Sequence, residues 1–252
     1  MRIPIVAGNW KMNMCSADSV ALARSIRQEL TDPGGVEVVV CPVSTVLNAV
    51  SDALDDSSIS VSGQNCYHAE NGAFTGELSP QMLHDAGCTW TILGHSERRH
   101  IFGETNALLN QKIKFALSSG LNVMFCIGET LEERESGTMN DVLQQQIGEG
   151  LAELNENAME HVVIAYEPVW AIGTGLTATS EQAEEAHAFV RSVVQDKFSG
   201  TVAESLRIQY GGSVKPDNTV ELMSQPNVDG ALVGGASLDA ESFVAIVRAA
   251  QS

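Results

Sequence analysis

The chain has 252 residues, of which 44% are hydrophobic and 18% charged, so it can bury a substantial core and is neither a disordered nor a fibrous protein. Its net charge of −18, from 14 Lys and Arg against 32 Asp and Glu, excludes a broad basic surface for nucleic acid or anionic lipid. An anionic ligand would therefore need a local site with its own lysine and backbone donors.

The cysteines and the N-terminus bear on where the chain resides. The N-terminal apolar run ends before Asn9 and Lys11, too early for a secretory signal, and no segment is long enough to span a membrane. The cysteines lack CxxC spacing, which favours reduced thiols in a cytosolic protein. We therefore expect a cytoplasmic protein with no nucleic-acid or membrane partner. The five cysteines are Cys15, Cys41, Cys66, Cys88 and Cys126.

Short runs rich in β-branched residues recur along the chain and alternate with helical patterns. Several runs are apolar at consecutive positions, which is typical of parallel strands buried on both faces. The eight expected strands are 3–8, 36–41, 59–64, 89–94, 122–128, 161–167, 206–211 and 228–234.

The segments between the strands carry helical signals. Sequences that match a capping box predict helix starts at 130–133 and 179–182, and the second precedes apolar residues at helical spacing. No linker divides the chain. Eight strand–helix units predict an α/β fold, a single (β/α)8 barrel over residues 1–252 with parallel strands and an outer ring of helices. A doubly wound open sheet is the alternative.

Polar residues and glycines stand where the expected strands end. In such a barrel these positions share the C-terminal face, so residues from separate units would form one cluster. Each is weak evidence alone, because a strand-end histidine is often structural and a glycine pair is usually a turn. The residues are Asn9, Lys11, His95, Glu97, Glu167, Gly211, Gly212, Ser213, Gly234 and Gly235.

Six motifs, in order and across essentially the whole chain, resemble triosephosphate isomerases. They are GNWKMN, ILGHSERR, CIGE, AYEPVWAIGTG, YGGSV and VGGASL. The resemblance implies an isomerase that interconverts dihydroxyacetone phosphate and D-glyceraldehyde 3-phosphate through an enediolate, in glycolysis and gluconeogenesis. It also implies that no cofactor or metal takes part, and the histidines show no ligand spacing.

By resemblance, Glu167 is the general base and His95 the electrophile. A carboxylate in an apolar, water-poor site gains basicity through desolvation. Ser96 and Glu97 suit a first helical turn, whose positive N-terminus would depress the pKa of His95 and keep the imidazole neutral. This enzyme family is itself the known example of that arrangement.

The resemblance also assigns the groups around the base. Lys11 would stabilise the enediolate oxygen and the phosphate, with Asn9 as an adjacent donor and Glu97 as the acid beside the lysine. Backbone N–H groups after the last two strands would hold the phosphate. The matching phosphate positions are Gly173, Ser213, Gly234 and Gly235.

The segment 168–178 resembles the family's closing lid, which would exclude water and protect the enediolate, a motion for which this family is again the known example. Tyr210 and Ser213 resemble the latch of the closed lid. The lid residues are Pro168, Val169, Trp170, Ala171, Ile172, Gly173, Thr174, Gly175, Leu176, Thr177 and Ala178.

The long connection 65–79 lacks strand or helix periodicity. By resemblance it docks into a second subunit, with Thr75 reaching toward that subunit's Asn9 and Lys11. We therefore expect a homodimer, whereas the alternative is a mobile surface loop. The expected interface residues are Phe74, Thr75, Asn13, Met14 and Cys15.

Two other functions are considered. A different sugar-phosphate isomerase or epimerase on the same barrel would keep the glycines but would often need a metal or a second carboxylate. A barrel that has lost its chemistry could serve as a binding protein. The presence of Asn9, Lys11, His95 and Glu167 together counts against the second alternative.

Overall fold

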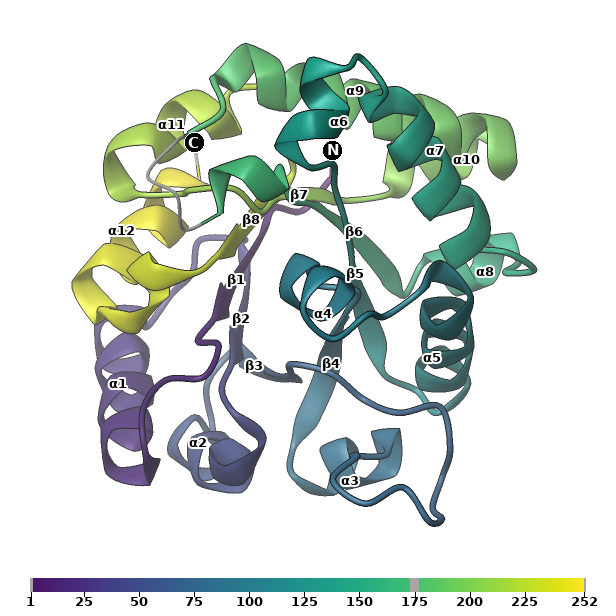
Figure 1. Cartoon of the computed structure of the whole chain (residues 1–252). Helices are drawn as coiled ribbons and strands as arrows, with labels where there is room; N and C mark the ends of the chain where they lie inside the picture. Colours follow the sequence, from purple (N-terminus) through teal and green to yellow (C-terminus); the bar gives the residue numbers. More distant parts are fainter. Residues whose placement is uncertain (1, 173–176, 252) are drawn as a thin grey trace.

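The computed structural model describes residues 2–172 and 177–251. Eight parallel strands close into a barrel in chain order, with helices around them (Figure 1). The expected strands are confirmed, and the open sheet is excluded because β8 pairs with β1, Gly230 opposite Ile5. The strands are β1 Ile5–Asn9, β2 Glu37–Cys41, β3 Ile59–Gly63, β4 Cys88–Leu93, β5 Asn122–Ile127, β6 Val162–Tyr166, β7 Ile208–Tyr210 and β8 Gly230–Val233.

The helices begin where the sequence supplies caps. Thr130 and Thr179 each close a capping box, with Glu133 and Gln182 respectively, so both expected helix starts are confirmed. The helices are α1 Ser16–Glu29, α2 Leu47–Ala53, α3 Pro80–Asp85, α4 Ser96–His100, α5 Asn106–Ser118, α6 Leu131–Glu135, α7 Met139–Gly150, α8 Glu156–Met159, α9 Ser180–Lys197, α10 Gly200–Ser205, α11 Pro216–Met223 and α12 Ala240–Ala249, with 3-10 turns η1 Ser44–Val46, η2 Val169–Ala171 and η3 Gly235–Leu238.

The strands are buried on both faces, which explains why their apolar residues are consecutive. One set of side chains packs with the helices, and a second set fills the barrel interior. Each fully buried Val, Leu or Ile contributes about 1.5–3 kcal/mol of transfer free energy. The interior set is Ile5, Ala7, Val39, Cys41, Trp90, Ile92, Met124, Cys126, Val163, Ala165 and Leu232.

The seam between β8 and β1 depends on a glycine. A Cβ atom at Gly230 would lie 1.9 Å from the backbone oxygen of Ile5, so only glycine fits there without moving the backbone. Next to it, the Ile5 N–H donates to the Asp229 carbonyl oxygen at 3.0 Å. This close approach completes the ring of strands.

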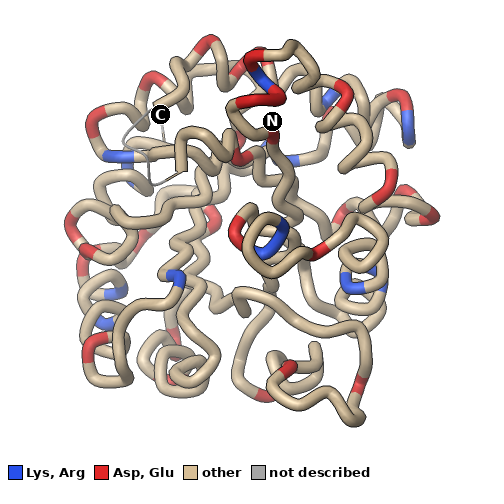
Figure 2. The backbone as a smooth tube through the Cα atoms, viewed as in Figure 1, with Lys and Arg blue, Asp and Glu red and all other residues tan. Residues whose placement is uncertain are grey.

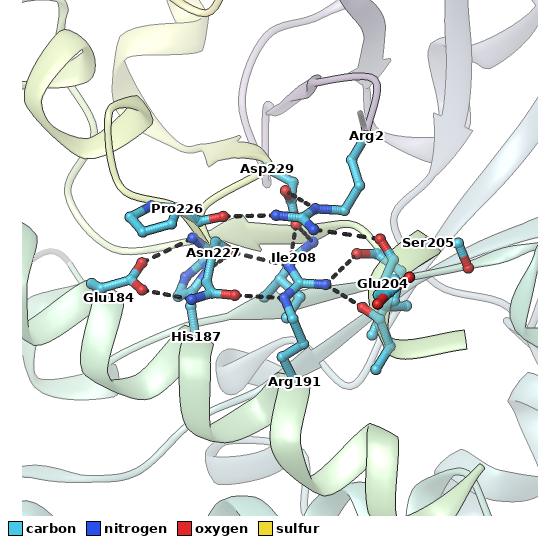
Figure 3. A network of polar contacts seen from close by, with 12 residues as sticks. Arg2, Glu184, His187, Arg191, Glu204, Ser205, Ile208, Pro226, Asn227 and Asp229 are labelled. Atoms are coloured by element: carbon cyan, nitrogen blue, oxygen red, sulfur yellow. Dashed lines mark hydrogen bonds and ion pairs between the residues drawn. The ribbon is translucent and has the colours of Figure 1, made fainter. Parts of the chain in front are cut away.

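Asp229 also anchors a network of ion pairs beside the start of β7 and β8 (Figure 3). Its carboxylate pairs with Arg2 and with Arg191, the latter at 2.6 Å, and accepts the Ile208 N–H at 2.9 Å. Arg191 also donates to the side chain of Asn227 at 2.7 Å. The network ties the N-terminus, α9 and the β7–β8 connection together.

The connection 65–79 contains neither helix nor strand, as its sequence predicts. Cys15 is exposed, and the other four cysteines are buried and free. Within the described ranges, no helix is both long enough and apolar enough to cross a membrane.

Candidate active site

A cavity of about 790 Å³ opens at the C-terminal ends of the strands. Such barrels hold their sites at this face, because the eight βα loops converge there. The cavity brings together residues that are up to 233 positions apart in the chain, from Asn9 to Ser242. The predicted site residues that line it are Asn9, Lys11, His95, Glu167, Ser213, Gly234 and Gly235.

Lys11 follows β1 in an uncommon backbone conformation. Its φ is 51°, in the left-handed region that costs a non-glycine residue free energy and that persists where the surroundings impose it. The Lys11 N–H donates to the Asn9 side-chain oxygen at 3.1 Å, and Gln64 donates to the Lys11 carbonyl oxygen at 2.9 Å. The Lys11 ammonium lies 2.7 Å from a carboxylate oxygen of Glu97, so Glu97 stands beside the lysine as expected.

His95 caps α4, as the sequence predicts. Its Nδ1 accepts the Glu97 N–H at 3.2 Å, so this nitrogen carries a lone pair and the proton resides on Nε2. Nε2 lies 3.0 Å from the carboxylate of Glu167. The imidazole therefore presents an N–H toward the proposed base.

Glu167 follows β6 and is only 2% exposed. Besides His95, its carboxylate accepts the Ser96 N–H at 3.0 Å. These two partners hold the side chain against the start of α4 in the absence of a substrate. A carboxylate with such partners is ionised and ready to accept a proton once it is released from them.

Two glycines make room for this glutamate. A Cβ atom at Gly128 would lie 1.8 Å from the backbone oxygen of Glu167, and one at Gly211 would lie 2.8 Å from its Cγ. The Cys126 thiol packs against the same carboxylate, and burial together with that negative charge raises the pKa of Cys126 well above its ordinary value. Glu167 is thus enclosed by β5, β7 and α4.

The pKa shifts in this arrangement differ from the sequence-based expectation. Burial opposes ionisation of Glu167, but His95, the Ser96 N–H and Lys11 outweigh it and lower the pKa of Glu167. Burial also opposes the imidazolium, yet Glu167 and Glu97 outweigh it and raise the pKa of His95. The expected gain in basicity and the expected depression of the His95 pKa are therefore both wrong for this arrangement, because the two groups face each other.

The phosphate positions lie at one side of the cavity. Ser213 follows β7, and Gly234 and Gly235 connect β8 to η3. A Cβ atom at Gly234 would lie 3.7 Å from Cε of Lys11, which places that lysine over the glycine. Gly173, the fourth predicted position, falls outside the described residues, as do 174–176 of the lid.

The described part of the expected lid is held at both ends. At its start, the Trp170 indole N–H donates to Glu129 at 2.9 Å, and Tyr166 donates to the same oxygen at 3.0 Å. At its end, the Ala178 backbone lies near the Tyr210 hydroxyl and lowers the pKa of Tyr210, although burial outweighs it and raises that pKa to about 12. The hydroxyl makes no hydrogen bond within the described residues. Tyr210 thus lies against the end of the lid, the place that its predicted latch role requires.

Of the residues expected at a subunit interface, Asn13 lines the cavity. Phe74, Thr75 and Cys15 are exposed, and Met14 has a left-handed φ of 67°. The Asn13 side chain donates to the Trp10 carbonyl oxygen at 2.7 Å. A second cavity of about 350 Å³ shares Asn9, Lys11 and His95 with the first and is also lined by Glu97.

Sequence reasoning assigned no role to several residues that shape the site. Cys126 and Glu129 belong to the CIGE motif, whose position after a strand was the available signal. Apart from the motifs, nothing in the sequence indicated the roles of the Ser96 N–H and Gly128, because their contacts with Glu167 arise only in the folded barrel. No group of three or more His, Cys, Asp or Glu that could hold a metal occurs within 2–172 and 177–251.

Comparison with known proteins now decides the family. A family model described as triosephosphate isomerase matches residues 4–250. The chain belongs to the triosephosphate isomerase family. Enzymes of this family interconvert dihydroxyacetone phosphate and D-glyceraldehyde 3-phosphate in glycolysis, and the fold is accordingly the TIM barrel, an α/β barrel.

Three relatives illustrate the similarity over full length. The triosephosphate isomerase of Syntrophotalea carbinolica is 54% identical over 248 residues, 98% of each chain. That of Geobacter metallireducens is 57% identical, over 98% of this chain and 99% of its own. That of Chloroherpeton thalassium is 52% identical over 100% of both chains.

Proposed function

We propose that this chain catalyses the triosephosphate isomerase reaction with Glu167 as the base and His95 as the electrophile. The observation that carries this assignment is the meeting of a buried carboxylate, an imidazole N–H and a lysine at one cavity. In one direction, Glu167 removes a proton from C1 of dihydroxyacetone phosphate. The electron pair of that C–H bond forms the enediolate C=C bond while the carbonyl oxygen gains negative charge.

The other groups act on that charge. The Nε2–H of His95 donates to the substrate oxygens, and the Lys11 ammonium stabilises the enediolate and the phosphate. Asn9 supplies a further donor beside Lys11, and Glu97 positions the lysine through their 2.7 Å contact. A proton then passes from the oxygen on C1 to the oxygen on C2, and Glu167 returns the abstracted proton to C2, which yields the aldehyde at C1 without any net change in the enzyme.

The resting contacts of Glu167 imply a movement. To reach a substrate carbon, its carboxylate must leave the Ser96 N–H and His95 Nε2, the partners that lower its pKa. Once these partners are lost in a site closed from water, burial raises the pKa of Glu167 and strengthens the base. Closure of the lid 168–178 would supply that closed site, with Gly173, Ser213, Gly234 and Gly235 donating to the phosphate.

We test the base by assaying the parent and Glu167→Gln side by side, in chelator, for conversion of D-glyceraldehyde 3-phosphate. Glutamine keeps the shape but cannot take up the proton, so we expect a loss of at least about 4 kcal/mol of transition-state stabilisation, roughly a thousandfold in rate. A variant within tenfold of the parent would refute the assignment. Activity that depends on metal would instead favour another sugar-phosphate isomerase.

The chain is further proposed to act as one catalytic domain, 1–252, in a cytoplasmic homodimer. Supporting the dimer, exposed apolar side chains lie around the 350 Å³ cavity: Met12 is 93% exposed and Phe102 66%, and both line it. A second copy's segment 65–79, with Phe74 and Thr75, would pack beside this cavity and against Asn13, Met14 and Cys15.

The dimer is tested with Thr75→Arg, which places a charge in the proposed contact. We expect the parent to sediment as a dimer and the variant as a folded, weakly active monomer, because burying an unpaired charge is costly. Thr201→Arg is the matched control, since Thr201 is exposed on α10. A monomeric parent, or equal dimerisation of both variants, would contradict the proposal.

A further inference from the structure

The cavity has a second basic residue, at its rim. Lys11 and Lys215 are the basic side chains that line it, whereas the chain as a whole carries a net charge of −18. Figure 2 shows how Asp and Glu outnumber Lys and Arg over the surrounding helices. A dianionic phosphate ester is therefore repelled at long range and needs local attraction at the cavity.

The ammonium groups of the two lysines differ in their charged partners. The Lys11 ammonium contacts Glu97 at 2.7 Å, and that carboxylate offsets much of its field. Lys215 is exposed, and its ammonium has no hydrogen bond or ion pair with any residue in the described part of the chain. Its charge is therefore available to a ligand at the mouth of the cavity.

The backbone of Lys215 is nevertheless held firmly. Its N–H donates to the Asn218 side-chain oxygen at 2.8 Å, and Asn218 donates in turn to the Ser213 carbonyl oxygen at 2.9 Å. The Lys215 carbonyl oxygen accepts the Thr219 hydroxyl at 2.6 Å. These hydrogen bonds thus fix the backbone of Lys215 two residues beyond Ser213, and none of them involves its ammonium.

An acidic residue opposes this charge. Asp217, in the first turn of α11, also lines the cavity and is exposed. It lies two residues from Lys215, so the two side chains bring opposite charges to the same rim. The field that an incoming phosphate meets there depends on both.

We propose that Lys215 is a substrate-capture residue, which attracts the phosphate dianion at the cavity mouth before Lys11 and the glycine N–H groups bind it, while Asp217 limits that attraction. The inference rests on the proposed function. It adds a binding residue on the path of the substrate rather than a group that acts on the reacting carbons.

The expected consequence is a change in association. Triosephosphate isomerases work near the diffusional limit, so kcat/KM reports how fast substrate is captured. At low ionic strength, Lys215→Ala should lower kcat/KM about three- to tenfold with kcat within about twofold of the parent, because steering acts on the encounter. Near 0.5 M salt the difference should shrink to under about twofold, since exposed charges are screened.

The experiment measures kcat and kcat/KM against salt for the parent, Lys215→Ala, Lys215→Arg and Asp217→Asn. We expect Lys215→Arg to match the parent and Asp217→Asn to raise kcat/KM at low salt. Lys114→Ala is the control for net charge, because Lys114 lies on α5 and pairs with Glu153 outside the cavity. If Lys215 had a purely structural role, the loss of kcat/KM in Lys215→Ala would not depend on salt, and Asp217→Asn would not raise kcat/KM.

Binding of inorganic phosphate, followed by calorimetry at low salt, separates this inference from the proposed function. Weaker phosphate binding in Lys215→Ala but not in Lys114→Ala supports capture even if the parent does not isomerise a triose phosphate. An active parent whose kcat/KM and phosphate affinity are unchanged by Lys215→Ala, or changed equally at all salt concentrations, would overturn the role of Lys215.

Discussion

Glu167 and His95 each shift the pKa of the other, so the protonation state of both depends on what binds in the site. With Glu167 against His95 and the Ser96 N–H, the pKa of Glu167 is lowered from 4.5 despite burial, because both partners favour the carboxylate. This contribution to folding stability is present above pH 4.5 and is lost as the pH falls through the lowered pKa. Binding that removes these partners must reverse the shift.

This reversal is measurable by carbon NMR of enzyme labelled at the glutamate carboxyl groups. We expect the Glu167 resonance to titrate below pH 4.5 in the free enzyme and above pH 4.5 in a complex with an enediolate analogue. The spectrum of Glu167→Gln identifies the resonance, and observing the enzyme directly avoids titration of the substrate phosphate. A pKa that does not move on binding would show that the carboxylate keeps its resting partners.

At the scale of elements, the segment proposed as a lid lies between two networks that are far apart in sequence. Its start is tied to β6 through Glu129, and its end lies against Tyr210 at the end of β7. Gly212 makes this possible, because a Cβ atom there would lie 2.2 Å from the Tyr210 hydroxyl. The barrel thus anchors both ends of the segment that would cover the substrate.

Tyr210→Phe tests the contact at the lid's end. Removal of the hydroxyl costs the closed state a hydrogen bond of about 0.5–1.5 kcal/mol, so we expect kcat to fall about two- to tenfold, with more phosphate released by elimination. Tyr67→Phe is the matched control, because Tyr67 packs on Phe74 in the segment 65–79. Equal effects of both substitutions on elimination would argue against a latch at Tyr210.

At the scale of the whole molecule, stability depends on closing the barrel at both ends of the chain. Asp229 pairs with Arg2 and Arg191 and precedes Gly230, where β8 meets β1. Its side chain is 6% exposed, so its removal would leave two guanidinium groups without their carboxylate in a shielded place.

Asp229→Ala is therefore expected to lower the free energy of unfolding by about 3–5 kcal/mol, as when one partner of a buried ion pair is deleted. Urea unfolding at one fixed protein concentration measures it, because dimerisation would make stability depend on concentration. Glu153→Ala, which breaks the exposed pair with Lys114, should have a much smaller effect. Similar losses in both variants would mean that the network at Asp229 does not stabilise the fold.

The sequence by itself determined the order of elements, the barrel and the identity of the candidate site residues. Consecutive apolar runs, the capping boxes at Thr130 and Thr179, and motifs at strand ends are local signals, so they can be read without coordinates. The long connection 65–79 and the helix start at His95 were equally local. For the same reason, these expectations agree with the structure.

Only the tertiary structure decided how those residues act on one another. The direction of the pKa shifts of Glu167 and His95 was wrong in prediction, because it depends on a 3.0 Å contact between residues 72 positions apart. The enclosure of Glu167 by Gly128 and Gly211, and the position of Lys215 at the cavity rim, likewise depend on strands that meet only when the barrel closes. Electrostatic and steric effects depend on the distances between groups, and the sequence determines those distances only through the fold.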